Sequence, residues 1–227
     1  MEKTYFGYTA SQIISKTDHT LLGRTATLEQ LDKVCCEALE YGAASVCIPP
    51  CFVKTARAYD GKLTVCTVIG FPNGYSTSRM KSFEARCAVE DGADEIDMVI
   101  NTNYVRMGRY ADALAEINEV KRACDWKTLK VIIETCLLTQ SEKINAARTV
   151  SESDADYIKT STGFSTGGAT REDVALLKAY CKGKKLKAAG GIKTIRDAAD
   201  FLSLGAHRLG SSSLLGMILK EENDEKL

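Results

Sequence analysis

The chain has 227 residues, of which 44% are hydrophobic, and its 30 Lys and Arg residues balance its 30 Asp and Glu residues. A chain of this length buries roughly 70 to 75% of the surface that it exposes when unfolded, so it needs no disulfide or metal ion to fold. The pI of about 6.7 and the lack of a basic run interleaved with aromatic residues argue against nucleic acid as a partner.

The first residues, MEKTYFGYTASQ, lack the apolar stretch of a signal peptide, and no later stretch approaches the roughly 20 apolar residues that span a bilayer. The nine cysteines are odd in number and scattered, as free thiols are in a reducing compartment. Cys47 and Cys51 come closest to the spacing of metal ligands, and no histidine completes a set. We therefore expect a cytoplasmic protein with no metal site and no membrane contact.

Short apolar segments alternate along the chain with longer segments of helical period. The segments that predict strands are KTDHT (16–20), ASVCI (44–48), LTVCTVI (63–69), EIDMVI (95–100), LKVIIET (129–135), DYIKT (156–160), LKAAG (186–190) and HRLGS (207–211). No Pro/Ser-rich linker interrupts them, which indicates one domain over residues 1–227. Eight strands, without a Gly-rich dinucleotide turn after the first, favour a closed (β/α)8 TIM barrel over an open doubly wound sheet.

In such a barrel the site lies where strands end and the following loops begin. The polar residues at those ends are Asp18, Asp97, Asn101, Glu134, Lys159 and Lys187. A lysine inside an apolar strand is unusual, and we count two, Lys159 and Lys187, in consecutive strands. Two neighbouring ammonium groups discourage each other's charge, so one lysine can attack a carbonyl as a neutral amine while the other stays protonated. The alternative is that either lysine points outward at the end of its strand.

Asp97 is an acidic residue within the apolar strand EIDMVI, on the same face as Glu95 and Val99. Facing inward, it could pair with a lysine or carry protons through a water molecule to the carbon next to an imine. Its simpler role would be to balance charge. Either role places Asp97 in the site.

Glycine-rich turns follow the last two strands, AGGIKT (189–194) and LGSSSLLG (209–216), and each opens a helical segment. Backbone N–H groups at a helix N-terminus bind anions, and TIM barrels often bind phosphate after the seventh and eighth strands. STGGAT (165–170) would add further donors. The sequence thus predicts a phosphorylated substrate.

Several motifs resemble those of the deoxyribose-phosphate aldolase family over about residues 13–218. They are DHTLL at Asp18, EIDMVIN at Asp97, VIIETCLLT at Glu134, YIKTSTGFSTGGAT at Lys159 and KAAGGIKT at Lys187. The resemblance implies a class I aldolase that reversibly cleaves 2-deoxy-D-ribose 5-phosphate to acetaldehyde and D-glyceraldehyde 3-phosphate through a lysine Schiff base, without a cofactor.

By motif position, the resemblance makes Lys159 the imine-forming lysine, Lys187 the lysine that tunes it and Asp97 the proton relay. Asp18, Thr20 and Cys47 would lie near the substrate. The residues expected to hold the phosphate are Gly163, Gly190, Gly191, Gly210, Ser212 and Ser213. Residues 102–110, TNYVRMGRY, depart from the family pattern, which is smaller and more apolar near the start of this segment.

Two alternatives remain open. The chain could be another phosphosugar enzyme, an epimerase or isomerase, in which carboxylates do the acid–base work and the lysines only bind phosphate. It could also be a non-catalytic barrel that binds phosphosugars, although loss of Lys159, Lys187 or Asp97 would then be expected. A homodimer is compatible with the sequence, but no segment identifies its interface.

Overall fold

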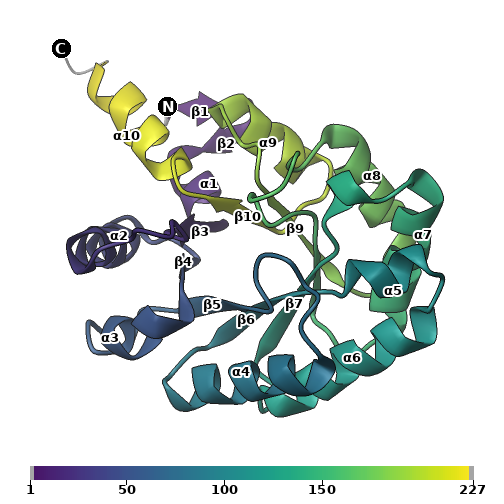
Figure 1. Ribbon diagram of the computed structural model, residues 1–227. Helices are drawn as coiled ribbons and strands as arrows, with labels where there is room; N and C mark the ends of the chain where they lie inside the picture. Colours follow the sequence, from purple (N-terminus) through teal and green to yellow (C-terminus); the bar gives the residue numbers. More distant parts are fainter. Residues whose placement is uncertain (1–2, 225–227) are drawn as a thin grey trace.

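The computed structural model describes residues 3–224. Its centre is a closed barrel of parallel strands in the order β10-β3-β4-β5-β6-β7-β8-β9, with helices around it (Figure 1). The barrel strands are β3 (Thr17–Thr20), β4 (Ser45–Ile48), β5 (Val65–Ile69), β6 (Glu95–Val99), β7 (Thr128–Ile132), β8 (Tyr157–Lys159), β9 (Lys185–Ala189) and β10 (Arg208–Ser211). Each overlaps one predicted segment, and the (β/α)8 fold class is confirmed.

Helices connect the strands and pack on the outside of the barrel. They are α2 (Leu28–Tyr41), α3 (Val53–Arg57), α4 (Ser78–Glu90), α5 (Thr102–Arg106), α6 (Tyr110–Ala123), α7 (Gln140–Glu152), α8 (Arg171–Tyr180), α9 (Ile195–Ser203) and α10 (Leu214–Asp224), with short 3-10 helices η1 (Pro50–Phe52) and η2 (Thr135–Leu137). Threonine caps several of them. Thr27 and Thr194 each accept a hydrogen bond from the third residue of the helix, whose side chain bonds back to the cap. None of the helices described is long and apolar enough to cross a membrane.

A short segment before the barrel was not predicted. Strands β1 (Thr4–Tyr5) and β2 (Tyr8–Thr9) pair antiparallel, and α1 (Ala10–Ile14) follows them. Elements of this length are too short to leave a hydrophobic period in the sequence. The pair lies beside α9, where the guanidinium of Arg196 stacks over the ring of Phe6 at 4.8 Å.

The hydrophobic core lies between the barrel and its helices. Side chains alternate along each strand, so Ile96 and Met98 of β6 belong to this outer core whereas Asp97 faces the barrel interior. A smaller apolar cluster, formed by Cys47, Cys66 and Val68, is separate from it. Buried charged side chains also face the barrel interior, and that is where the predicted catalytic residues meet.

Candidate active site

The strand register brings the three predicted catalytic residues together. Lys159 and Lys187 hold paired positions on β8 and β9. Their Nζ atoms both donate to Oδ2 of Asp97, at 2.7 and 2.6 Å, and all three side chains are buried. Asp97 is therefore in position both to balance charge and to exchange a proton with either lysine.

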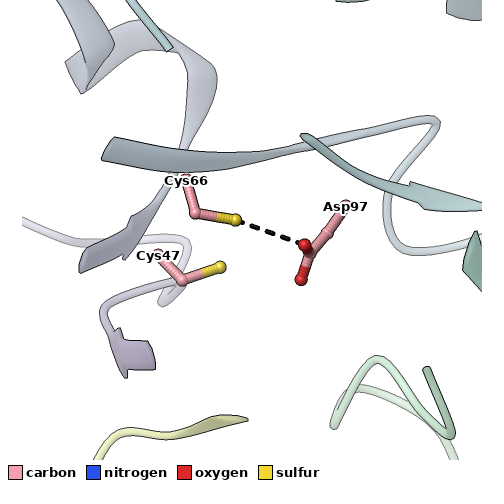
Figure 2. Close-up of side chains that lie close together, drawn as sticks. All are labelled: Cys47, Cys66 and Asp97. Atoms are coloured by element: carbon pink, nitrogen blue, oxygen red, sulfur yellow. Dashed lines mark hydrogen bonds between the residues drawn. The ribbon is translucent and has the colours of Figure 1, made fainter. Parts of the chain in front are cut away.

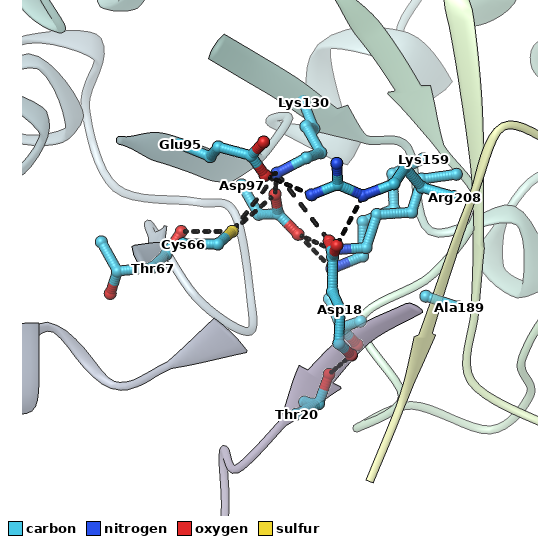
Figure 3. Close-up of polar contacts among 12 residues, drawn as sticks. Asp18, Thr20, Cys66, Thr67, Glu95, Asp97, Lys130, Lys159, Ala189 and Arg208 are labelled. Atoms are coloured by element: carbon cyan, nitrogen blue, oxygen red, sulfur yellow. Dashed lines mark hydrogen bonds and ion pairs between the residues drawn. The ribbon is translucent and has the colours of Figure 1, made fainter. Parts of the chain in front are cut away.

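A third lysine, which the sequence analysis missed, lies in the same cluster. Lys130 of β7 is fully buried and donates to Oδ1 of Asp97 at 2.8 Å, opposite the oxygen that the other two lysines share (Figure 3). It also pairs with Glu95 at 2.7 Å. The count of two strand lysines was wrong, although LKVIIET carries the same signal, a lysine within an apolar segment.

Asp18 and Arg208 complete a closed circuit of ion pairs inside the barrel. Arg208 donates from Nε to Asp18 and from a terminal nitrogen to Glu95, each at 2.7 Å, and Lys187 pairs closely with Asp18. Positive and negative groups alternate around this circuit, which we call the charged ring. Its members in order are Asp97, Lys187, Asp18, Arg208, Glu95 and Lys130.

These contacts set the ionisation of the buried groups. Burial alone would raise the pKa of Asp97, but Lys130, Lys159 and Lys187 outweigh it and hold that pKa well below the ordinary value. Burial alone would lower the pKa of Lys187, but Asp18 and Asp97 raise it. The carboxylates of Asp18 and Asp97 thus favour the protonated form of Lys187.

Cys47 lies at the edge of the charged ring, beside Cys66 (Figure 2). Its hydrogen bond with Cys66 lowers the pKa of Cys47, whereas burial raises the pKa of Cys66 well above its usual value. The two sulfur atoms and one oxygen of Asp97 lie within 4.8 Å of one another, close enough to share a metal ion. Both oxygens of Asp97 already accept from ammonium groups, which oppose a cation there. The absence of a metal remains a prediction.

The predicted phosphate residues line one cavity of about 420 Å³. It is lined by Thr20, Leu21, Leu22, Gly23, Thr162, Gly163, Phe164, Gly190, Gly191, Ile192, Gly210, Ser211, Ser212 and Ser213. All six glycines and serines assigned to phosphate are among them, as is Thr20. The lining contains no lysine or arginine, so an anion here would be held by backbone N–H groups and hydroxyls.

The segment STGGAT, expected to add donors, does not line this cavity. A Cβ atom on Gly168 would lie 2.4 Å from the carbonyl carbon of Gly190, so Gly168 packs directly against the backbone of the phosphate turn. The N–H of Ala169 is used by the carbonyls of Ala189 and Gly190. The segment therefore supports the cavity from behind and does not line it.

Glu134 holds one wall of the cavity in place. Its backbone is left-handed, with φ of 53°, which is uncommon for a residue other than glycine and marks a constrained position. Its carboxylate accepts the backbone N–H of Thr162 at 3.2 Å and also the Thr162 hydroxyl. The end of β7 thereby positions the loop that follows β8 and Lys159.

The chain is similar to known aldolases over most of its length. Residues 12–219 match the family described as DeoC/LacD family aldolase. The chain is 49% identical over 215 residues to a deoxyribose-phosphate aldolase of Clostridioides difficile, covering 94% of this chain and 98% of the relative. It is 50% identical over 211 residues to one of Streptococcus pyogenes, covering 92% and 95%.

Solved structures give the same picture. A structure described as a putative deoxyribose-phosphate aldolase from Coccidioides immitis superposes with a TM-score of 0.89 at 39% identity, covering 98% of this chain and 90% of that one. A deoxyribose phosphate aldolase from Aeropyrum pernix, described as a tetramer, superposes with a TM-score of 0.86 at 29% identity, covering 95% and 92%.

Proposed function

Because the chain belongs to the DeoC/LacD family of aldolases, we propose that it reversibly cleaves 2-deoxy-D-ribose 5-phosphate to acetaldehyde and D-glyceraldehyde 3-phosphate. The observation that carries the site assignment is the shared contact of Lys159 and Lys187 with one oxygen of Asp97. Each amine lies within hydrogen-bonding distance of the carboxylate, which supports the proposed roles of Lys159 as nucleophile, Lys187 as permanent cation and Asp97 as proton carrier. These are the groups that imine chemistry requires.

In the cleavage direction, Lys159 attacks C1 of the open-chain sugar, and loss of water leaves an imine. The C3 hydroxyl then loses its proton, the C2–C3 bond breaks, and its electrons pass into the imine to form an enamine. D-Glyceraldehyde 3-phosphate departs at this point. Asp97 and Lys187, acting through a water molecule, return a proton to the enamine carbon, and hydrolysis releases acetaldehyde from Lys159.

The glycine-rich cavity supports the phosphate part of the proposal. Thr162, Gly163 and Phe164 line it directly after the strand that ends at Lys159, and Gly190 and Gly191 follow the strand of Lys187. A substrate with its carbonyl at Lys159 can therefore place a phosphate in this cavity. Asp18, Thr20 and Cys47 are proposed to lie near the rest of the sugar.

Trapping with borohydride tests the mechanism. The full chain is incubated with acetaldehyde and sodium borohydride, and the adduct is located by intact and peptide mass, with Lys159→Leu as control. We expect one ethyl group on Lys159 and none on the control. An unmodified protein that retains activity would favour the epimerase or isomerase alternative, in which borohydride has no target.

We further propose that residues 1–227 act as one catalytic domain, in the cytoplasm and as a homodimer. Two apolar side chains of α4, Met80 and Phe83, are exposed by 52% and 57% and lie three residues apart on the helix surface. Sedimentation velocity of the wild type and of Phe83→Asp tests whether this face holds two copies together. A wild-type protein that sediments as a monomer would overturn the dimer.

A further inference from the structure

A second cavity, of about 300 Å³, opens beside the phosphate cavity. It is lined by Pro72, Asn73, Tyr75, Val99, Thr102, Asn103, Arg106, Glu134, Leu137, Phe164 and Ser165. We call this cavity the second arm and the phosphate cavity the first arm. Nothing in the proposed reaction of deoxyribose phosphate uses the second arm.

The second arm lies next to the reacting groups. Val99 lines it and stands two residues beyond Asp97 on the same face of β6, about 6.6 Å further along the strand. Phe164 lines both arms. Glu134 of the second arm accepts hydrogen bonds from Thr162 of the first. The two arms therefore adjoin on either side of Phe164 above the barrel interior.

The charges of the second arm favour an anion. Arg106 is its only cationic lining residue, and its side chain forms no ion pair or hydrogen bond within residues 3–224. Glu134, the only lining carboxylate, is already engaged with Thr162. Arg106 also interacts electrostatically with Glu142. The carboxylate of Glu142, however, already accepts hydrogen bonds from the backbone N–H and the hydroxyl of Thr139, at 2.7 and 2.9 Å. The guanidinium is thus left to pair with a group from outside the chain.

The remaining lining groups suit a short carbon chain that ends in such an anion. Val99, Leu137 and Phe164 offer apolar contact, while Thr102 and Asn103 offer a hydroxyl and an amide beside Arg106. Thr102, Asn103 and Arg106 all come from the segment that departs from the family pattern.

We propose that the second arm binds the carboxylate of short acceptor aldehydes, so that the enzyme also joins acetaldehyde to aldehydes ending in a carboxylate. The inference rests on the proposed aldolase function. The enamine on Lys159 attacks the acceptor carbonyl carbon, forming one C–C bond, and the carbonyl oxygen takes up a proton. Water then hydrolyses the imine and frees a 3-hydroxy aldehyde that retains the carboxylate.

Succinic semialdehyde is the probe, and butanal is its uncharged counterpart. Each is supplied with acetaldehyde to the full chain and to two variants, Arg106→Leu and Arg109→Leu. Arg109 is a matched control from the same segment, because it is paired with Asp112 at 2.8 Å and lines neither arm. Removing a charge-assisted contact should raise the KM for succinic semialdehyde about tenfold in Arg106→Leu, relative to butanal and to the Arg109→Leu control.

Inorganic phosphate separates the two arms. It should compete with D-glyceraldehyde 3-phosphate for the first arm and leave the KM for succinic semialdehyde unchanged. Equal competition against both acceptors would place the carboxylate in the first arm and overturn the proposal, as would an Arg106→Leu variant that treats succinic semialdehyde and butanal alike. If neither D-glyceraldehyde 3-phosphate nor succinic semialdehyde gave an aldol product with acetaldehyde, the proposed aldolase function itself would be wrong, and the proposal for the second arm would be wrong as well.

Discussion

Lys130 and Asp97 stand at paired positions on neighbouring strands, and the lysine occupies the one carboxylate oxygen that Lys159 and Lys187 leave free. This contact fixes the orientation of the Asp97 carboxylate. Lys130 donates to Oδ1 of Asp97 whereas the proposed nucleophile Lys159 donates to Oδ2, so we expect Lys130 to position the proposed proton relay.

We expect Lys130→Met to destabilise the protein by about 3 to 5 kcal/mol, because it leaves the buried carboxylates of Asp97 and Glu95 short of a partner. The rate of borohydride trapping at Lys159 should fall as well, since Asp97 loses its orientation. Urea unfolding and trapping kinetics measure both effects. Lys127→Met, at an exposed position in the same segment, should change stability by no more than about 0.5 kcal/mol. A Lys130→Met protein that is trapped at Lys159 as fast as this control would refute the positioning role.

The packing of Gly168 against the phosphate turn gives a second prediction. The Cβ of Gly168→Ala would displace the backbone of Gly190, so the KM for 2-deoxyribose 5-phosphate should rise at least about tenfold, an effect worth roughly 1.4 kcal/mol. Unphosphorylated 2-deoxyribose should be affected much less. Gly216→Ala is the control, because Gly216 of α10 has no atom within 4 Å of the added carbon and helical Gly→Ala stabilises by roughly 0.5 to 1 kcal/mol.

Thr162→Val tests the link from Glu134 to the first arm. The variant loses the hydroxyl bond to a buried carboxylate, which contributes about 1.5 to 3 kcal/mol, so the loop after β8 should loosen. We expect a higher KM for the phosphorylated sugar with a smaller change in kcat. Thr149→Val removes a comparable bond, from Thr149 to the carbonyl of Asn145 at 3.0 Å in α7, and should leave both constants near wild type. Equal effects of the two variants would argue against a role for Glu134 in shaping the cavity.

The charged ring should stabilise the fold in acid until the pH falls below about 4. The folded-state pKa values of Asp97 and Asp18 lie below those of the unfolded chain, so their contribution to stability is complete above about pH 4 and is lost as pH falls further. Urea midpoints measured from pH 2 to 7 should drop steeply only below about pH 4. Asp97→Asn should flatten that drop, and an unchanged slope would show that other carboxylates control acid unfolding.

Much of the architecture could be predicted because each barrel strand is an apolar run of its own. Once the strands were identified, Lys159 and Lys187 could be predicted to lie side by side, because they belong to consecutive strands. The contacts of Arg208 could not be predicted, because the sequence does not indicate that a side chain in β10 reaches Glu95 in β6 across the barrel. The second arm could not be predicted either, because its lining comes from four segments that are separate in the sequence.

The charged ring sets the balance of charges around Lys159, the proposed nucleophile. Within the part of the chain that the structure describes, the ring contains three carboxylates and three cations, and Lys159 is attached to it as a fourth cation. The barrel interior is therefore electroneutral when Lys159 carries no charge, as it must when it attacks an aldehyde. An aldehyde that reacts at Lys159 would therefore meet a ring whose own charges already balance.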